Sequence, residues 1–301
     1  MLAAIEIPEP YAKRLRIGAC SWKYDSWKGL IYDPDKRYGP DDYLPDYARY
    51  FDTVEIDQWF WSLFPGGVKL PDPRVVKQYA ESVPAGFTFS VKVPNSITLT
   101  HYYAKQPRGS ESHANKPNPH FLDVDLLNQF IETLGPMHGA LGPVMFQFEY
   151  LNKKKMPSMA AFLDRLDAFL GKAPRGILYA IETRNPNYLQ EDFFGFLRSH
   201  HLGFVLLDGY YMPSISEVTG RLDIRTAKFS VIRLHGPDRA KMQEQTGGDW
   251  SRIVEPKEAG LEAAASIVQA NARAGVTTYV NVNNHYEGCA PLTIERLVKL
   301  L

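Results

Sequence analysis

The sequence predicts an α/β protein consisting of one (β/α)8 barrel of the TIM type in a single domain. Its 301 residues suit one large barrel as well as two ordinary domains. Short apolar or alternating runs, each followed by turn residues and then by a stretch with helical spacing, recur eight times along the chain. No internal repeat or low-complexity linker divides the sequence. Eight βα units in about 300 residues are typical of such a barrel.

The predicted elements alternate from one end of the chain to the other. Strands are expected over residues 15–19, 53–57, 87–92, 143–148, 177–182, 203–208, 229–235 and 277–282. Helical spacing predicts helices over 44–51, 73–82, 122–137, 157–170, 191–200, 256–274 and 291–300, several with proline in the first turn. The sixth unit is the weakest, since residues 215–220 allow only a turn or two. Residues 1–14 are predicted as an N-terminal extension and 15–301 as the barrel.

A long segment, residues 98–121, interrupts the alternation. It is polar, rich in Pro, Gly and Asn, and follows neither a helical nor a strand period. Loops of this length are usually functional covers or disordered segments. Because it follows the third predicted strand, it belongs at the C-terminal face of the barrel, where active sites of this fold lie. A lid is the favoured interpretation, and a passive or disordered insertion is the alternative.

Composition and charge exclude several classes of protein. The 34 basic and 34 acidic residues balance, so net charge gives no argument for nucleic-acid binding, although a local patch stays open. The first ten residues do not resemble a signal peptide, and no run of about 18 apolar residues predicts a membrane span. The two cysteines, Cys20 and Cys289, do not form a CxxC pair. We therefore expect a cytoplasmic protein that does not enter a membrane.

Polar side chains gather at the predicted C-terminal ends of the strands, the barrel mouth. Side chains on a strand alternate faces, so polar residues two positions apart near its end point into the same mouth. Five strands end in such a pair: Glu55 and Asp57, Gln147 and Glu149, Glu182 and Arg184, Arg233 and His235, and Asn281 and Asn283. Lys92 ends the third strand and Asp208 the sixth in equivalent places. Such pairs on successive parallel strands indicate one shared polar site.

Two interpretations of this site are open. The charges could form an ion-pair network that closes the barrel, since each unpaired buried ion costs several kcal/mol. They could instead bind a small molecule or a phosphate, which is the interpretation that we favour. Loop aromatics add a similar choice, because the tryptophans at 22, 27, 59 and 61 could form a stacking wall for a sugar or base, or only close the top of the barrel.

The segment NNHYEGCAP, residues 283–291, is a further candidate for binding an anion. It contains Asn283, Asn284 and His285 and lies before a helix expected from about Pro291. Backbone amides at a helix start can bind an anion, and the loops after strands seven and eight form the usual phosphate site of barrels. The motifs GxGxxG, GxxxxGK[ST], HExxH and GxSxG are missing from the sequence, so the corresponding nucleotide-binding, zincin and serine-hydrolase classes lack support.

Several segments together resemble the DUF72 family, also called YecE-like proteins. They are IGACSWKYDSWKGLIYDP, YARYFDTVEIDQWFW, GFTFSVKVP, LGPVMFQFEY, YAIETRNPNY, IRLHGP and YVNVNNHYEGCAPLTIERL, in order over roughly residues 16–300. The resemblance implies a TIM-type barrel of bacteria or archaea and no established activity. Cys20 stands where the family often has a small residue, and WFW at 59–61 replaces a more usual Phe-Tyr version.

The function that the sequence favours is acid–base catalysis on a small polar or anionic substrate, phosphorylated or sugar-like, by a hydrolase, lyase or isomerase. The predicted catalytic residues are Glu55, Asp57, Glu182 and the proton carrier His235. The predicted substrate-binding residues are Lys92, Gln147, Glu149, Arg184, Arg233, Asn281, Asn283, Asn284, His285 and Trp22. No cofactor is predicted. The expected partner is the small-molecule substrate.

Two alternatives belong to other classes. A metal-dependent phosphodiesterase or nucleic-acid-processing barrel would hold a divalent ion between Glu182, Asp208 and His235, which end three successive strands. This alternative rests on analogy with other barrels, and the arginines at the same level argue against it. A non-catalytic binding module, in which the charges are purely structural, is the other alternative.

Overall fold

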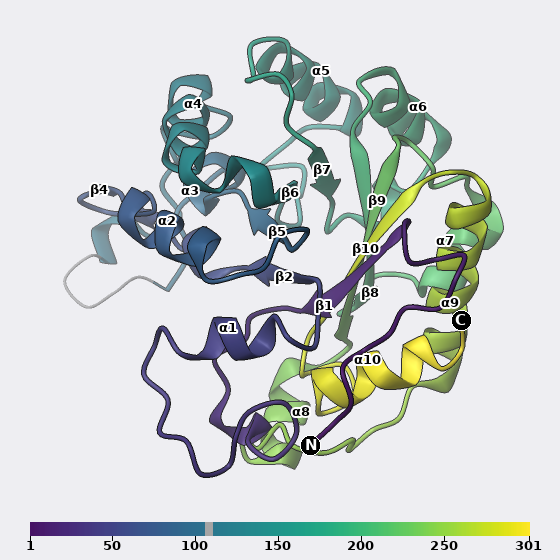
Figure 1. Cartoon of the computed structure of the whole chain (residues 1–301). Coiled ribbons are helices and arrows are strands. Elements are labelled where there is room, and N and C mark those ends of the chain that lie inside the picture. The colour runs from purple at the N-terminus through teal and green to yellow at the C-terminus, as the bar shows by residue number, and fades with distance from the viewer. Residues whose placement is uncertain (106–110) are drawn as a thin grey trace.

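The computed structural model describes residues 1–105 and 111–301 and has a barrel of parallel strands surrounded by helices (Figure 1). The strands are β1 (Leu15–Ala19), β2 (Thr53–Ile56), β5 (Thr88–Lys92), β6 (Leu141–Gln147), β7 (Tyr179–Glu182), β8 (Gly203–Gly209), β9 (Phe229–Gly236) and β10 (Thr277–Val282). Their hydrogen-bonded order is β1-β10-β9-β8-β7-β6-β5-β2, all parallel. The predicted fold class is confirmed.

A helix follows each strand, as the alternating pattern predicts. These helices are α1 (Tyr43–Tyr47), α2 (Pro73–Glu81), α4 (Val124–Thr133), α5 (Met159–Leu170), α6 (Glu191–Ser199), α7 (Ile215–Arg221), α9 (Glu258–Arg273) and α10 (Ala290–Val298). The sequence did not predict α3 (Asn95–Thr98), α8 (Arg239–Thr246) or the hairpin of β3 (Leu63–Phe64) and β4 (Gly67–Val68).

The sequence does not predict helix α8 because few of its side chains are buried. Its buried residues are Met242 and Thr246, so it has no continuous apolar stripe. Local capping defines its ends instead. The Asp238 side chain accepts a hydrogen bond from the backbone N–H of Lys241, and Gly247 ends the helix in the left-handed conformation, with φ of 61°.

The barrel closes between β1 and β2, the two ends of the hydrogen-bonded order. Cys20 and Glu55 form an isolated parallel bridge just beyond β1. Lower in the seam a side chain replaces the backbone ladder: the Tyr47 hydroxyl accepts a hydrogen bond from the Ala19 N–H at 2.7 Å and donates one to the Thr53 carbonyl at 2.9 Å. Backbone groups that would otherwise be unpaired at the seam are satisfied in this way.

Two apolar cores fix the position of the polar site. The larger core lies between the strands and the surrounding helices. The smaller core fills the lower, N-terminal half of the barrel interior and consists of Met145, Ala180, Val205, Phe229, Val231 and Tyr279. Toward the C-terminal ends of the strands, the buried side chains inside the barrel include the charged residues Glu55, Glu182 and Arg233.

The N-terminal segment and the segment after β5 both pack on the barrel. Leu2 donates a backbone hydrogen bond to Leu30, and neighbouring apolar residues of the N-terminal segment contact the larger core. In the second segment, the Asn118 amide donates hydrogen bonds to the carbonyls of Ser96 and Leu99, both at 2.7 Å. The central part of the predicted lid, residues 106–110, lies outside the described residues, and the lid stays a prediction.

No helix in the described part of the chain is long and apolar enough to cross a bilayer.

Candidate functional site

Arg233 is the centre of an ion-pair network at the C-terminal end of the barrel. It projects inward from β9 and is 1% exposed. Its Nε and Nη2 atoms bind both oxygens of Glu55 from β2, at 2.8 and 2.6 Å. Its Nη1 donates to Glu182 of β7 and, at 3.1 Å, to the side-chain oxygen of Gln147 of β6. A single guanidinium therefore joins three strands in addition to its own.

A second arginine completes the pairing of Glu182. The Nε atom of Arg184 lies 2.6 Å from Glu182, and its guanidinium lies 4.3 Å from the ring centroid of Tyr210. Although burial raises the pKa of Glu182, the charges of Arg184 and Arg233 lower it to about 2. Glu182 is therefore ionised at neutral pH. Two carboxylates and two guanidiniums pair within this network, so these four groups carry no net charge.

Lys92 and Asp57 lie beside the network without joining it. The Lys92 ammonium at the end of β5 is 8% exposed and lies 4.0 Å from the Phe60 ring centroid. Burial and the charge of Arg233 lower the pKa of Lys92, while burial and the charge of Glu55 raise that of Asp57. Among residues 1–105 and 111–301, neither group has an ion-pair partner within 4.0 Å.

His235, at the end of β9, packs against a cysteine. Its Nε2 lies 3.6 Å from the Sγ of Cys20, and the Cys20 thiol donates to Glu55 at 3.5 Å. Burial, together with the charge of Arg233, lowers the pKa of His235 well below its usual range, so the imidazole is neutral. One ligand atom from each of Cys20, Glu55 and His235 lies within 4.8 Å of the others, a grouping that suits a metal ion.

Asp208 does not point into the barrel, which corrects its predicted place in the site. Val205 belongs to the interior core, so alternation directs Asp208, three residues on, to the opposite face of β8. Its Oδ2 accepts a hydrogen bond from the Tyr286 hydroxyl at 2.7 Å, and a Cβ placed on Gly260 of α9 would lie 2.9 Å from the same oxygen. The alternative metal set of Glu182, Asp208 and His235 is therefore wrong, because Asp208 faces the helix layer.

Side chains of the NNHYEGCAP segment form hydrogen bonds with the segment itself and with the helix starts beside it. The side-chain oxygen of Asn284 accepts the Ala290 N–H at 2.8 Å, at the start of α10. The buried Glu287 accepts the Lys257 N–H at 2.6 Å, just before α9. His285 Nδ1 lies 2.5 Å from the Asn283 side-chain oxygen. The first amide of α10 is thus already capped by the protein itself, which leaves an anion less room there than predicted.

The remaining predicted residues lie at different depths. Asn281 is fully buried inside the barrel, and neither atom of its amide has a partner among the described residues. Trp22 is 1% exposed and packs edge-on against Tyr79 at 5.1 Å, as part of the larger core. Glu149 accepts hydrogen bonds from the N–H and hydroxyl of Thr100, at 3.2 and 2.8 Å, and so anchors the segment after β5.

Sequence reasoning missed Cys20 and Tyr210 as neighbours of the site. The signal for Cys20 was present, because alternation along β1 directs Arg16, Gly18 and Cys20 to one face. Tyr210 had no such signal. It follows β8 with a positive φ of 55°, and this turn brings its ring to 6.0 Å from that of His235.

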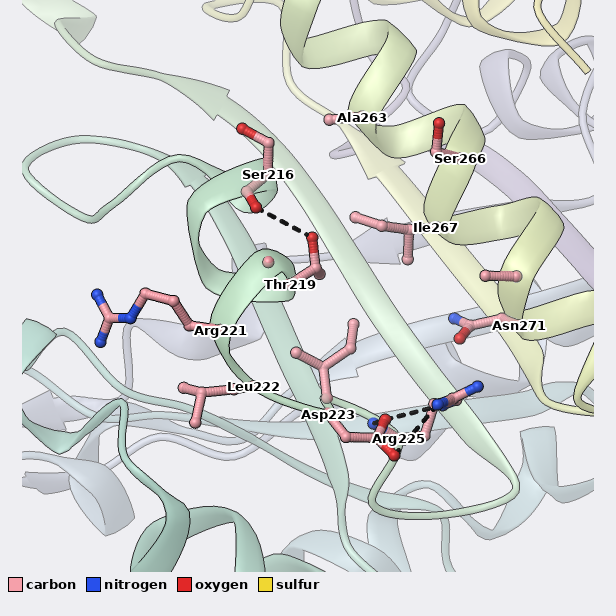
Figure 2. Close-up of a pocket in the computed structure, with 13 residues that line it drawn as sticks. Ser216, Thr219, Arg221, Leu222, Asp223, Arg225, Ala263, Ser266, Ile267 and Asn271 are labelled. Atoms are coloured by element: carbon pink, nitrogen blue, oxygen red, sulfur yellow. Dashed lines mark hydrogen bonds and ion pairs between the residues drawn. The ribbon is translucent and has the colours of Figure 1, made fainter.

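A cavity of about 620 Å³ lies elsewhere, between α7 and α9 (Figure 2). Its lining includes Thr219, Ile267 and Asn271. Figure 2 shows Arg225 paired with Asp223 at its edge, and both of these side chains are exposed to solvent. None of the predicted site residues lines this cavity, and each of its charged residues has an exposed ion-pair partner, Arg225 with Asp223 and Arg221 with Glu217, so the C-terminal end of the barrel is the stronger candidate site.

Comparison with known proteins agrees with this architecture. The family model described as "Protein of unknown function DUF72" matches residues 16–301. The chain belongs to the DUF72 family. A DUF72 family protein from Thermotoga maritima is similar over 95% of this chain and 98% of its own, with 20% identity and a TM-score of 0.65. One from Enterococcus faecalis covers 95% of this chain and 96% of its own, with 17% identity and a TM-score of 0.61. At these identities the likeness shows the fold alone. No curated protein gave a match.

Proposed function

We propose that this DUF72 protein is an enzyme that binds a small anionic molecule at the C-terminal end of its barrel and transfers a proton to or from it. The observation that carries the proposal is the pair of charged side chains, Lys92 and Asp57, that have no ion-pair partner in the described chain. Lys92 is buried and Asp57 half-buried, and a buried charge without a partner, as at Lys92, costs several kcal/mol. A ligand that supplied the partners would recover that free energy on binding.

The cationic side chains of this region suit an anion in particular. Lys92 supplies an ammonium group. Arg184 contacts Glu182 through its Nε atom, and its two Nη groups can donate hydrogen bonds to a ligand. Phosphate or carboxylate groups match this donor set. Asp57 and His235, each partly exposed, supply a carboxylate and a neutral imidazole beside them. Together these groups support acid–base chemistry on a phosphorylated or carboxylated metabolite.

The deeper residues have a different part in this proposal. Glu55, Glu182 and Arg233 are at most 1% exposed and bind one another. They hold the strand ends in place and fix the positions of Asp57 and His235, each two residues beyond a network member. We assign them a positioning role, in place of direct contact with the substrate.

A ligand screen tests the proposal. Phosphorylated and carboxylated metabolites are screened by thermal shift against the wild type, Lys92→Met and Asp57→Asn. Lys77→Met is the matched control, because Lys77 is an exposed lysine of α2 paired with Glu81. We expect anions to stabilise the wild type and the control, and Lys92→Met to lose that response. Asp57→Asn retains binding and loses turnover of the identified ligand. An equal response in Lys92→Met and the wild type would contradict the proposal.

A further inference from the structure

Cys20, His235 and Glu55 bring three different metal-binding atoms together on three strand ends. The Cys20 Sγ lies 3.6 Å from the His235 Nε2 and 3.5 Å from a Glu55 oxygen. All three ligand atoms lie within 4.8 Å of one another. Cys20 is 3% and Glu55 0% exposed, while His235 keeps partial contact with solvent.

These distances correspond to the edges of a tetrahedral site. Zinc binds sulfur at about 2.3 Å and nitrogen or oxygen at about 2.0–2.2 Å, with tetrahedral angles. Two such bonds place sulfur about 3.5–3.6 Å from each of the other ligand atoms. Both sulfur distances in the structure have this value. The His235 and Glu55 ligand atoms lie within 4.8 Å of each other.

The surrounding structure holds the three side chains in place. The Cys20 N–H donates to the Val282 carbonyl at 2.8 Å, and the Cys20 backbone bridges to Glu55. Arg233 binds both carboxylate oxygens of Glu55 and so orients them. Hydrogen bonds of this kind orient carboxylates that bind metals. Burial raises the pKa of the Cys20 thiol, so an ion must displace its proton, which leaves for solvent.

The structure assigns a metal site to this chain: we propose that Cys20, His235 and Glu55 bind one divalent ion of the zinc or cobalt type. The thiolate and imidazole select such an ion over magnesium or calcium. Three protein ligands with an open fourth position are typical of catalytic zinc sites.

Charge indicates what occupies the fourth position. Three carboxylates, of Glu55, Asp57 and Glu182, face the three cations of Lys92, Arg184 and Arg233 in this region. A divalent ion with the Cys20 thiolate adds one net positive charge. Hydroxide or an anionic ligand at the fourth position would neutralise it. Only this last step rests on the proposed function, because binding of the metal itself requires no substrate. With the ion bound, His235 Nε2 is a metal ligand, so Asp57 is the acid–base group of the proposed function.

Metal content tests the site directly. The full chain is purified without chelator, stripped, and reloaded with Zn²⁺ or Co²⁺. We expect about one ion per chain in the wild type and a thiolate-to-cobalt charge-transfer band. Cys20→Ser should lose the band and bind Co²⁺ at least about tenfold more weakly. His235→Gln should weaken Co²⁺ binding by at least a similar factor. Cys289→Ser is the matched control, because Cys289 is also a buried free cysteine and lies at the start of α10.

X-ray absorption at the zinc edge of the wild type needs no variant and therefore covers the case in which Cys20→Ser fails to fold. The proposal predicts one sulfur neighbour at about 2.3 Å. A wild type that retains no metal, a zinc ion without a sulfur neighbour, or equal Co²⁺ affinity in Cys20→Ser and Cys289→Ser would each overturn it. Lys92→Met should keep its metal. Loss of the anion response with the metal retained would therefore concern the proposed function alone.

Discussion

Replacing Arg233 with methionine should strongly destabilise the protein at neutral pH. The guanidinium is 1% exposed and makes both hydrogen bonds of a bidentate pair with Glu55, besides its contact with Glu182. In Arg233→Met, Glu182 keeps Arg184 as its partner, whereas Glu55 keeps only the weak thiol donor of Cys20. In the metal-free protein, Glu55 is then a fully buried carboxylate without a counter-ion.

The expected loss of stability follows from the unpaired buried carboxylate of Glu55. Removing one partner of a buried ion pair costs about 3–5 kcal/mol. Unfolding entropy is about 2.1 cal/mol/K per residue near the melting temperature, or roughly 0.6 kcal/mol/K for a chain of this length. We therefore expect the melting temperature of Arg233→Met to fall by about 5–8 °C. Arg184→Met should lose less, because its side chain is 12% exposed and Glu182 keeps Arg233.

A double-variant cycle distinguishes the cost of the unpaired Glu55 carboxylate from the cost of lost side-chain packing at Arg233. Melting is followed by circular dichroism and calorimetry for Arg233→Met, Glu55→Gln and the double variant at pH 7. If the unpaired carboxylate causes the loss, the double variant should recover at least about half of it, since glutamine carries no charge. A loss below about 1 kcal/mol in Arg233→Met, or a double variant no more stable than Arg233→Met, would refute the reasoning.

Three further predictions concern the seam, the loop after β10 and its histidine. Tyr47→Phe should cost about 1–3 kcal/mol in chemical denaturation, because it leaves two backbone groups unpaired at the seam; a loss equal to that of an exposed Tyr→Phe change would contradict it. Asn284→Ala should cost about 1 kcal/mol by removing the cap of α10, and unchanged stability would argue against that cap. Burial lowers the pKa of His285 to about 4, so the unfolded state binds more protons than the folded state between pH 6.5 and pH 4. The free energy of unfolding should therefore decrease as the pH is lowered from 6.5 to 4. His285→Asn should reduce this loss by about 1–2 kcal/mol, and NMR titration of the wild-type ring should give a midpoint near 4 rather than 6.5.

The barrel was predictable because its signals are local. Each strand is a short apolar or alternating run, and the predicted strand boundaries differ from the structure by at most two residues, whereas some helix ends differ by four. Proline and capping residues such as Asp123 and Ser158 mark helix starts in the sequence itself. The β3–β4 hairpin and α8 gave no comparable signal, since neither buries a continuous apolar face.

The site was predictable only where alternation could be counted from the right residue. Alternation along their strands places Glu55, Glu182 and Arg233 on the inner face of the barrel. The structure joins these three side chains by ion pairs. The position of Asp208 at a strand end predicts a place in the site, whereas alternation from Val205 directs its side chain to the helix-facing side of β8. Which charges pair with each other depends on side-chain reach across strands, which no spacing within one strand encodes.

The five polar pairs divide by depth, which the sequence did not show. In four of them the first member is buried and the second is partly exposed: Glu55 and Asp57, Glu182 and Arg184, Arg233 and His235, and Asn281 and Asn283. A buried member can contact an anionic substrate only if the network opens, whereas a partly exposed member needs no such change. Substitution of first members should therefore lower stability, and substitution of second members should change ligand response at nearly unchanged stability. Arg184→Met with a weakened anion response and a small melting shift, beside Arg233→Met with a large one, is the pattern expected. Equal melting losses in both variants would mean that the two depths form one structural unit.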